Sequence, residues 1–143
     1  MTMKTAAVFS LILLLLCGCR KAQDDQETTV MLPLENREQA AADWNDFVKS
    51  ADGELNAAQR KMDSLRDKIY LASARNKVNI RRVINKNEYI LEKLRKELYD
   101  HNGWFESHIG SYTDENARKI EKFKTYFTKK IDGIKTEIDD CQC

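Results

Sequence analysis

Residues 51–72 read ADGELNAAQRKMDSLRDKIYLA, and the spacing of their apolar side chains decides the fold class. Seven of them follow one another at alternating intervals of four and three residues: Ala51, Leu55, Ala58, Met62, Leu65, Ile69 and Ala72. This heptad-like spacing places them along one face of an α-helix, where they form the seam of a coiled coil or helical bundle. The sequence therefore predicts an all-α protein built around a long amphipathic helix.

Beyond this seam the apolar pattern shifts its phase. Asn76 and Asn79 occupy the continuation of the seam, and the apolar face resumes one step later at Ile80, Val83, Asn87, Ile90, Leu94 and Leu98. The shift indicates either a stutter within one helix or the site of a bend. Because neither Pro nor Gly occurs between residues 54 and 102, we predict one continuous helix from Glu54 to about Asp100, roughly 70 Å long.

Turn signals mark the ends of this helix. Asp52-Gly53 predicts a break before it, and Asn102-Gly103 predicts the left-handed stop that commonly closes a helix. Upstream, Asn36 and Gln39 have the spacing of a capping box for a first helix over residues 37–51. We expect that helix to bury Ala40, Trp44, Phe47 and Val48.

Downstream, Thr113 is a good N-cap for a last helix, which carries one apolar stripe. The stripe consists of Ala117, Ile120, Phe123, Phe127, Ile131, Ile134 and Ile138. The predicted architecture over residues 35–140 is an elongated, coiled-coil-like bundle of about three helices. In it, the long helix and the last helix form a hairpin, and the first helix packs alongside.

The N-terminal residues have a different composition. Residues 6–16 are apolar and uncharged, and Lys4 precedes them. From the last of them onward, residues 16–21 read LCGCRK. Eleven helical residues rise only about 16 Å, roughly half the thickness of a bilayer's hydrocarbon core. A basic start, a short apolar core and a small residue at its end are typical of a secretory signal peptide, here residues 1–18.

Leu16, Cys17, Gly18 and Cys19 resemble the lipobox of bacterial lipoproteins, with Leu three residues before the modified cysteine and a small residue directly before it. The resemblance covers the first 19 residues and implies cleavage before a lipidated Cys19, which a tether over residues 19–34 would join to the helical domain. Arg20, in place of Asp, favours the outer membrane by the family's sorting rule, on its periplasmic or its surface face. The alternative is a cleaved signal followed by an unmodified Cys19.

Charge is distributed unevenly along a chain whose net charge is only +1. Residues 24–54 hold nine acids against two bases, whereas residues 55–96 hold twelve bases against four acids. One interpretation is structural: the acidic segment folds back on the basic one, or the bases are simply solvated. The other is functional, namely a positive stripe that suits an acidic protein, an anionic glycan or lipid head groups. The stripe would consist of Lys61, Lys68, Arg75 and Arg82, spaced by sevens, followed by Lys86 and Lys93.

Nucleic acid is not an expected partner, because no aromatic residues interleave with the stripe. A second candidate surface is the segment NGWFESHIGSY at residues 102–112, predicted as a loop. Trp104 and Phe105 would either cap the end of the bundle or form a contact patch. His101 and His108 flank them at a spacing that matches no ligand motif, so we expect no metal site.

Catalytic signatures such as a glycine-rich phosphate loop or HExxH do not occur in the sequence. We therefore expect no enzyme and no cofactor. The tail at residues 141–143 reads CQC, and after export Cys141 and Cys143 would be oxidised to each other or across two chains. A bridge across two chains would staple a parallel homodimer.

These observations favour a lipid-anchored protein of the bacterial cell envelope that acts as a helical binding or scaffold module. It would be structural, adhesin-like or part of a secretion complex, bound to the membrane through its anchor and to a protein or an anionic envelope polymer through its helices. One alternative is a periplasmic chaperone of the jellyfish-like type, although such proteins are soluble trimers. Another is an inhibitor or immunity lipoprotein.

Overall fold

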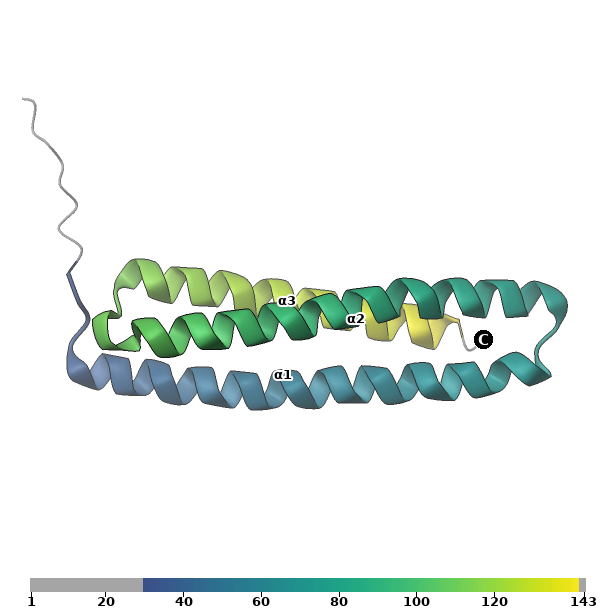
Figure 1. The fold of residues 1–143 in the computed structure, drawn as a ribbon, viewed down its shortest axis with the longest axis horizontal. Helices are drawn as coiled ribbons and strands as arrows, with labels where there is room; N and C mark the ends of the chain where they lie inside the picture. The colour runs from purple at the N-terminus through teal and green to yellow at the C-terminus, as the bar shows by residue number, and fades with distance from the viewer. Residues whose placement is uncertain (1–29, 142–143) are drawn as a thin grey trace, which may run out of the picture.

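A computed structural model describes residues 30–141, which fold into three long helices (Figure 1). Short 3-10 segments lie in the two connections, and within the described residues the one β pairing is an isolated bridge between Met31 and Thr113. The all-α prediction is confirmed. The elements are α1 (Leu34–Lys68), η1 (Ile69–Leu71), α2 (Ala74–His108), η2 (Ile109–Ser111) and α3 (Asp114–Asp140).

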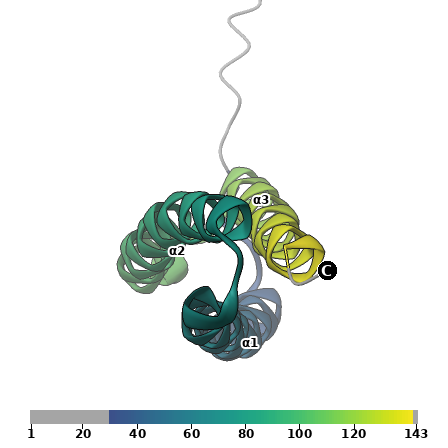
Figure 2. The same ribbon diagram turned by 90° about the vertical axis from the view of Figure 1, so that its right-hand side faces the viewer.

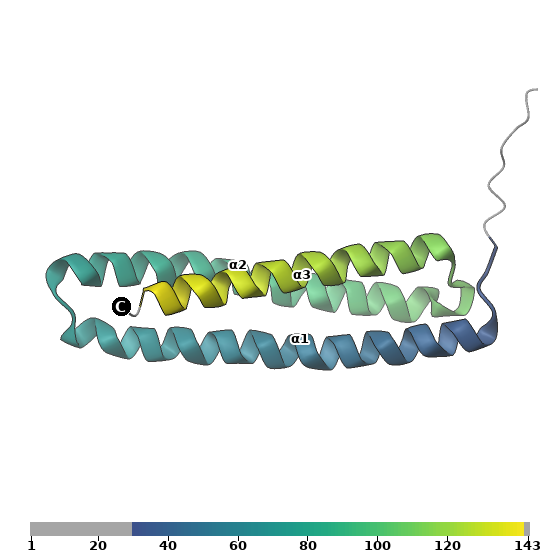
Figure 3. The same ribbon diagram turned by 180° about the vertical axis from the view of Figure 1, so that it is seen from behind.

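The helices run up, down and up along one long axis. α1 packs against both α2 and α3, which contact each other less. Viewed along the axis, the three helices enclose a common interior and wind about one another (Figure 2). α1 and α2 have 35 residues each, about 52 Å, whereas α3 has 27 residues, about 40 Å. Consequently α3 ends before the turn between α1 and α2, as seen from both sides (Figures 1 and 3).

Each helix directs one apolar stripe into a single core. The stripe predicted for the last helix is confirmed from Ile120 to Ile138, and Ala51 to Leu65 of the seam are buried as predicted. On α2 the buried face differs slightly from the predicted one, because Ile84 and Leu91 lie deeper than Val83 and Ile90. α2 packs against both other helices, so its buried face is wider than one seam. The buried apolar residues are Trp44, Ala51, Leu55, Ala58, Met62, Leu65, Ile80, Ile84, Leu91, Leu94, Leu98, Phe105, Tyr112, Ile120, Phe123, Phe127, Ile131, Ile134 and Ile138.

The prediction of one continuous helix over residues 54–100 is wrong. The chain reverses at residues 69–73, where η1 closes α1 and Ser73 begins α2. The Ser73 hydroxyl accepts a hydrogen bond from the backbone N–H of Asn76, at 3.4 Å. The phase shift after Ala72 therefore marks the turn between two helices. Because the chain reverses there, each helix can direct its own apolar stripe into the core.

Two glycine signals were misinterpreted as helix ends. Gly53 lies inside α1, and Gly103 lies inside α2. A helical glycine costs only about 1 kcal/mol relative to alanine, and burial of neighbours such as Leu55 and Phe105 exceeds that cost. The hairpin is accordingly formed by α1 and α2, and not by a long helix paired with the last one as predicted.

The helix starts were predicted with mixed success. Thr113 caps α3 as predicted, because its hydroxyl accepts a hydrogen bond from the N–H of Asn116 at 3.3 Å. The capping box at Asn36 is wrong, because α1 already begins after Pro33, whose fixed φ suits a helix start. Gln39 instead donates to a carboxylate oxygen of Asp43 at 2.7 Å.

The residues just before α1 are held against the other connection. The N–H of Leu32 donates to the carbonyl of Tyr112 at 2.9 Å, and the Arg37 side chain donates to the carbonyl of Gly110. The last residues of the tether predicted over 19–34 therefore belong to the folded part. The chain enters the bundle at the end where α2 turns into α3, opposite the turn between α1 and α2 (Figure 1).

The predicted signal peptide, Cys19 with the first part of its tether, and Cys143 lie outside the described residues. Within residues 30–141, no helix combines the length and the apolar character that crossing a bilayer requires.

Candidate functional site

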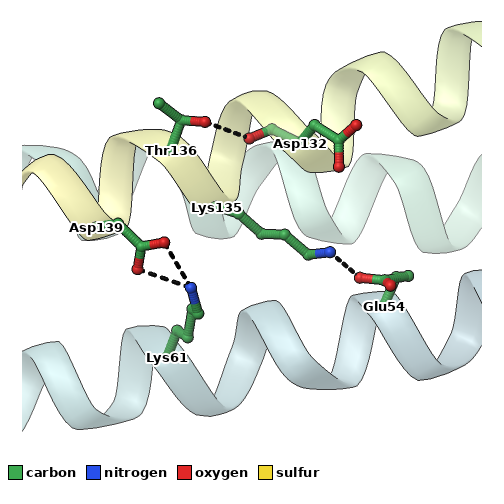
Figure 4. A network of polar contacts seen from close by, with 6 residues as sticks. All are labelled: Glu54, Lys61, Asp132, Lys135, Thr136 and Asp139. Carbon is green, nitrogen blue, oxygen red and sulfur yellow. Dashed lines mark hydrogen bonds and ion pairs between the residues drawn. The ribbon is translucent and has the colours of Figure 1, made fainter.

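We call residues 55–96, with twelve bases against four acids, the basic block. Ion pairs between α1 and α3 involve one of its bases, Lys61. The Lys61 ammonium group donates to both carboxylate oxygens of Asp139, at 2.7 Å each, and Lys135 pairs with Glu54 (Figure 4). All four side chains remain partly exposed, so each pair contributes only about 0–1 kcal/mol. The pairs mainly fix the register of α3 along α1.

A second group of pairs involves α2. Lys86 pairs with Glu137 of α3, and Arg66 of α1 pairs with Glu88. Beside the first pair, the amide of buried Asn87 donates to the second carboxylate oxygen of Glu137 at 3.0 Å. These hydrogen bonds, the one from Lys86 first, hold the pKa of Glu137 below its ordinary value. Ion pairs within the bundle thus neutralise bases on both sides of residues 68–82, namely Lys61, Arg66 and Lys86.

The source of the neutralising carboxylates differs from the fold-back interpretation. That interpretation required the acidic segment at residues 24–54 to face the basic block. Among the described residues of that segment, Glu54 is the one that forms an ion pair between helices, and its partner Lys135 lies outside the block. Asp139 and Glu137, near the end of α3, face the basic block instead, because α3 ends beside it.

The predicted stripe of bases spaced by sevens is wrong as a geometric unit. The turn at residues 69–73 places Lys61 and Lys68 on α1, and Arg75 and Arg82 on α2. A spacing of seven residues aligns side chains only within one helix. Lys86 lies in the ion pair with Glu137, and Lys93 lies 3.7 Å from Glu97 on its own helix.

The remaining bases gather at the end of the α1–α2 hairpin, from beside the end of α3 out to the turn. We call residues 68–82 the hairpin tip; they hold five bases and no acid. Arg82 donates to the Asn79 side chain at 2.7 Å. For Arg75, Lys77 and Arg81, residues 30–141 supply no ion-pair partner.

The hairpin tip also presents apolar side chains to solvent. Leu71 is 92% exposed, Tyr70 is 85% exposed, and Val78 is 69% exposed. Met62 and Leu65, on the last two turns of α1 before the tip, are fully buried, so the core of the bundle extends close to the tip. Sequence reasoning missed Tyr70 and Leu71 as surface residues of interest, although both lie off the seam that continues through Ile69.

The opposite end of the bundle is filled by aromatic rings. Trp44 stacks on Phe105 with 5.3 Å between ring centroids, and Phe105 meets Tyr112 edge to face at 5.4 Å. The Trp44 indole N–H donates to the side-chain oxygen of Asn102 at 2.9 Å. Phe105, one of the two residues of the predicted contact patch, is therefore a core residue. The segment 102–112 is mostly helix, because α2 continues to His108.

Trp104, the other residue of that patch, is half-buried and lines a groove of about 610 Å³ between α2 and α3. These two helices contact each other less than either contacts α1. Tyr126 and Phe123 form its α3 wall, and burial, more than the nearby Glu97, raises the pKa of the Tyr126 hydroxyl. A mostly apolar groove with a few polar groups could take a small ligand.

The histidines beside this groove have local partners. The His101 ring stacks on Phe123 with 3.7 Å between centroids, and its Nδ1 lies 2.8 Å from the Glu97 carbonyl oxygen. His108 stacks on Trp104 in a similar way. Nowhere in residues 30–141 do three side chains of His, Cys, Asp or Glu come together as metal ligands.

Cys141 closes α3 beside the hairpin. It is half-buried, its sulfur lies 3.7 Å from the side-chain nitrogen of Asn79, and burial raises the pKa of its thiol. The predicted partner Cys143 lies outside the described residues, so the disulfide stays a prediction.

Comparison of the chain with protein-family models, with curated proteins and with solved structures found no match.

Proposed function

We propose that the chain is a lipid-anchored protein of the bacterial cell envelope that acts as a helical binding or scaffold module. In this proposal Cys19 carries the lipid anchor in the outer membrane, and the hairpin tip binds an anionic partner. The chain works by binding and not by catalysis.

One observation carries the proposal: the point where the chain enters the bundle and the hairpin tip lie at opposite ends of the molecule (Figure 1). The entry is fixed by the hydrogen bond between Leu32 and Tyr112. α1 then separates the two ends by about 52 Å. Fully extended, the residues between Cys19 and Val30 would add at most about 40 Å. An anchored bundle can therefore present its tip roughly 90 Å from the lipid.

The charge of the tip supports an anionic partner. Elsewhere along the basic block, Lys61, Arg66 and Lys86 are paired with carboxylates. At the tip, Arg75 and Arg81 are exposed and positive without such a pair among residues 30–141. A group of unneutralised charges of one sign attracts an oppositely charged partner and speeds its approach.

A crosslinking pull-down with the anchor-free chain (Cys19→Ser) from fragmented native envelopes, which recovers bound proteins and bound membrane alike, tests the proposal. We expect the double substitution Arg75→Glu with Lys77→Glu to abolish recovery of the partner while helicity stays unchanged. The matched control is Arg95→Glu with Lys129→Glu, which makes the same charge change on exposed positions away from the tip. Equal recovery with both variants would refute the tip as the binding surface.

The anchor is tested separately by mass spectrometry of the mature N-terminus. We expect a chain that starts at Cys19 and carries acyl chains on that residue. An unmodified Cys19 would refute the anchored location without bearing on the tip.

A further inference from the structure

The hairpin tip exposes apolar side chains next to basic ones, which is the combination found on surfaces that bind membranes. Single exposed apolar residues are normal on protein surfaces, but Tyr70 and Leu71 are adjacent, lie in the turn at the very end of the hairpin, and stand between Lys68 and Arg75 in the sequence. We infer that the hairpin tip docks on an anionic phospholipid bilayer, with Tyr70 and Leu71 entering the head-group region. The inference deepens the proposed function, since it rests on the tip being the binding surface.

The shape of the tip favours a bilayer over a protein. The exposed apolar side chains are two on the turn, Tyr70 and Leu71, and one near the start of α2, Val78. A stable protein interface buries about 800 Å² on each partner, and a narrow protruding turn offers far less. A bilayer takes up protruding side chains one by one, so it needs no complementary pocket.

The residue types match the depth at which each would lie. Tyrosine is enriched at the membrane–water interface, where its ring is apolar and its hydroxyl stays hydrated. Leucine beside it supplies hydrocarbon that gains from leaving water. Both side chains are almost fully exposed, so docking would require no rearrangement of the bundle.

The charges around these residues match a layer of phosphates. Arg75, Lys77 and Arg81 lie on the first two turns of α2, next to η1. Each base near an anionic bilayer strengthens binding about fivefold. The N-terminus of α2 adds its positive partial charge at the same place.

The carboxylates near the tip do not cancel this charge. Asp67 directly precedes the tip and is exposed at the end of α1. Asp140 is exposed at the end of α3, where Cys141 lies beside Asn79 of the tip, so these two acids stand against the five bases of the tip. Asp63 and Glu88 both pair with Arg66, one turn below. The end of the hairpin therefore keeps a positive excess.

Co-sedimentation with lipid vesicles tests the inference. The protein is the mature chain, residues 19–143, with Cys19→Ser so that the anchor cannot bind by itself; this chain contains the whole bundle. Vesicles contain either phosphatidylcholine alone or phosphatidylcholine with about a third phosphatidylglycerol. We expect binding to the anionic vesicles only, weakening as salt concentration rises.

Variants then locate the contact. We expect Arg75→Glu with Lys77→Glu to weaken vesicle binding by at least about 30-fold. Tyr70→Ser with Leu71→Ser should weaken it by about tenfold or more. Tyr99→Ser, an exposed tyrosine on α2 away from the tip, should leave it unchanged. All these positions face solvent, wholly or in part, so circular dichroism should show intact helicity.

Several results would overturn the inference. Equal binding to neutral vesicles, or binding unchanged in both tip variants, would exclude docking through the tip. If the chain binds soluble polyglutamate through the tip but binds no vesicles, the bilayer is the wrong partner and the proposed anionic partner is an acidic protein. If it binds neither, the tip is no anion-binding surface, and the inference and that part of the proposed function fail together.

Discussion

Replacing Trp44 with phenylalanine should destabilise the bundle by about 2–3 kcal/mol. Trp44 has no exposed surface, and its indole N–H donates to Asn102 at 2.9 Å. Phenylalanine keeps one ring against Phe105 but loses roughly 40 Å² of buried area, about 1 kcal/mol. The lost hydrogen bond costs about 1 kcal/mol more, and the cavity left behind adds a further part.

Urea unfolding followed by circular dichroism at 222 nm measures this loss. With a slope of about 1–3 kcal/mol per molar urea, the midpoint should fall by roughly 1–2 M while the slope stays constant. The matched control is Trp104→Phe, which makes the same change at a half-buried neighbour on α2 whose indole forms no hydrogen bond within residues 30–141. It should cost less than about 1 kcal/mol.

A double-mutant cycle with Asn102→Ala isolates the hydrogen bond. We expect a coupling of about 1 kcal/mol between Trp44→Phe and Asn102→Ala. The reasoning would be refuted if Trp44→Phe cost no more than Trp104→Phe. A coupling near zero would show that the bond between the indole and Asn102 contributes nothing to stability.

Three further predictions concern stability. Gly53→Ala and Gly103→Ala should each raise the free energy of unfolding by about 0.5–1 kcal/mol in urea titrations, because both glycines are helical and an added Cβ at either position meets no atom within 4 Å. Thr113→Ala should lower it by about 1 kcal/mol through loss of the cap of α3, whereas Thr113→Ser should restore most of that loss. Because the folded state lowers the pKa of Glu137, its carboxylate stabilises the bundle above its ordinary pKa of 4.5, and this contribution disappears as pH falls through the lowered value. The difference in unfolding midpoint between the unmodified chain and Glu137→Gln should therefore be present at pH 7 and close toward pH 3; a gap that stays constant would contradict the assignment.

The features that sequence reasoning predicted correctly are those specified by local signals that agree. The last helix has a cap at Thr113, acids in its first turn and an uninterrupted apolar stripe from Ile120 to Ile138. The helix contains no proline and only one glycine, Gly133, which does not interrupt the spacing of the apolar stripe. Its boundaries followed because cap, charge and periodicity point to the same residues.

The turn at residues 69–73 was missed because its local signals are weak. The phase shift after Ala72 left a bend open, but because the segment contains neither glycine nor proline, a stutter within one continuous helix was predicted. The reversal is favoured by contacts distant in sequence, since it lets α1 and α2 bury their stripes against each other. Gly53 and Gly103 misled in the opposite direction, because tertiary burial overrides a penalty of about 1 kcal/mol.

The candidate site was predictable in composition but not in arrangement. The sequence shows that residues 68–87 carry bases without acids. Which of these bases are neutralised depends on where α3 ends, since Asp139 and Glu137 reach Lys61 and Lys86 only at that register. The position of Tyr70 and Leu71 in a turn at the end of a hairpin was not predictable either, because a continuous helix would place them in its middle.

The fixed entry of the chain also sets how the bundle would respond to mechanical tension. A pull between the anchored N-terminus and a partner at the hairpin tip acts along the axes of α1 and α2. Because both points of attachment lie at the ends of α1, the pull stretches that helix along its backbone hydrogen bonds, and its packing against α2 and α3 resists the stretch. The hydrogen bond from Leu32 to Tyr112 passes the load at the entry to the connection between α2 and α3. The up-down-up arrangement thus makes the molecule a stiff strut along the one direction in which its two ends would be held.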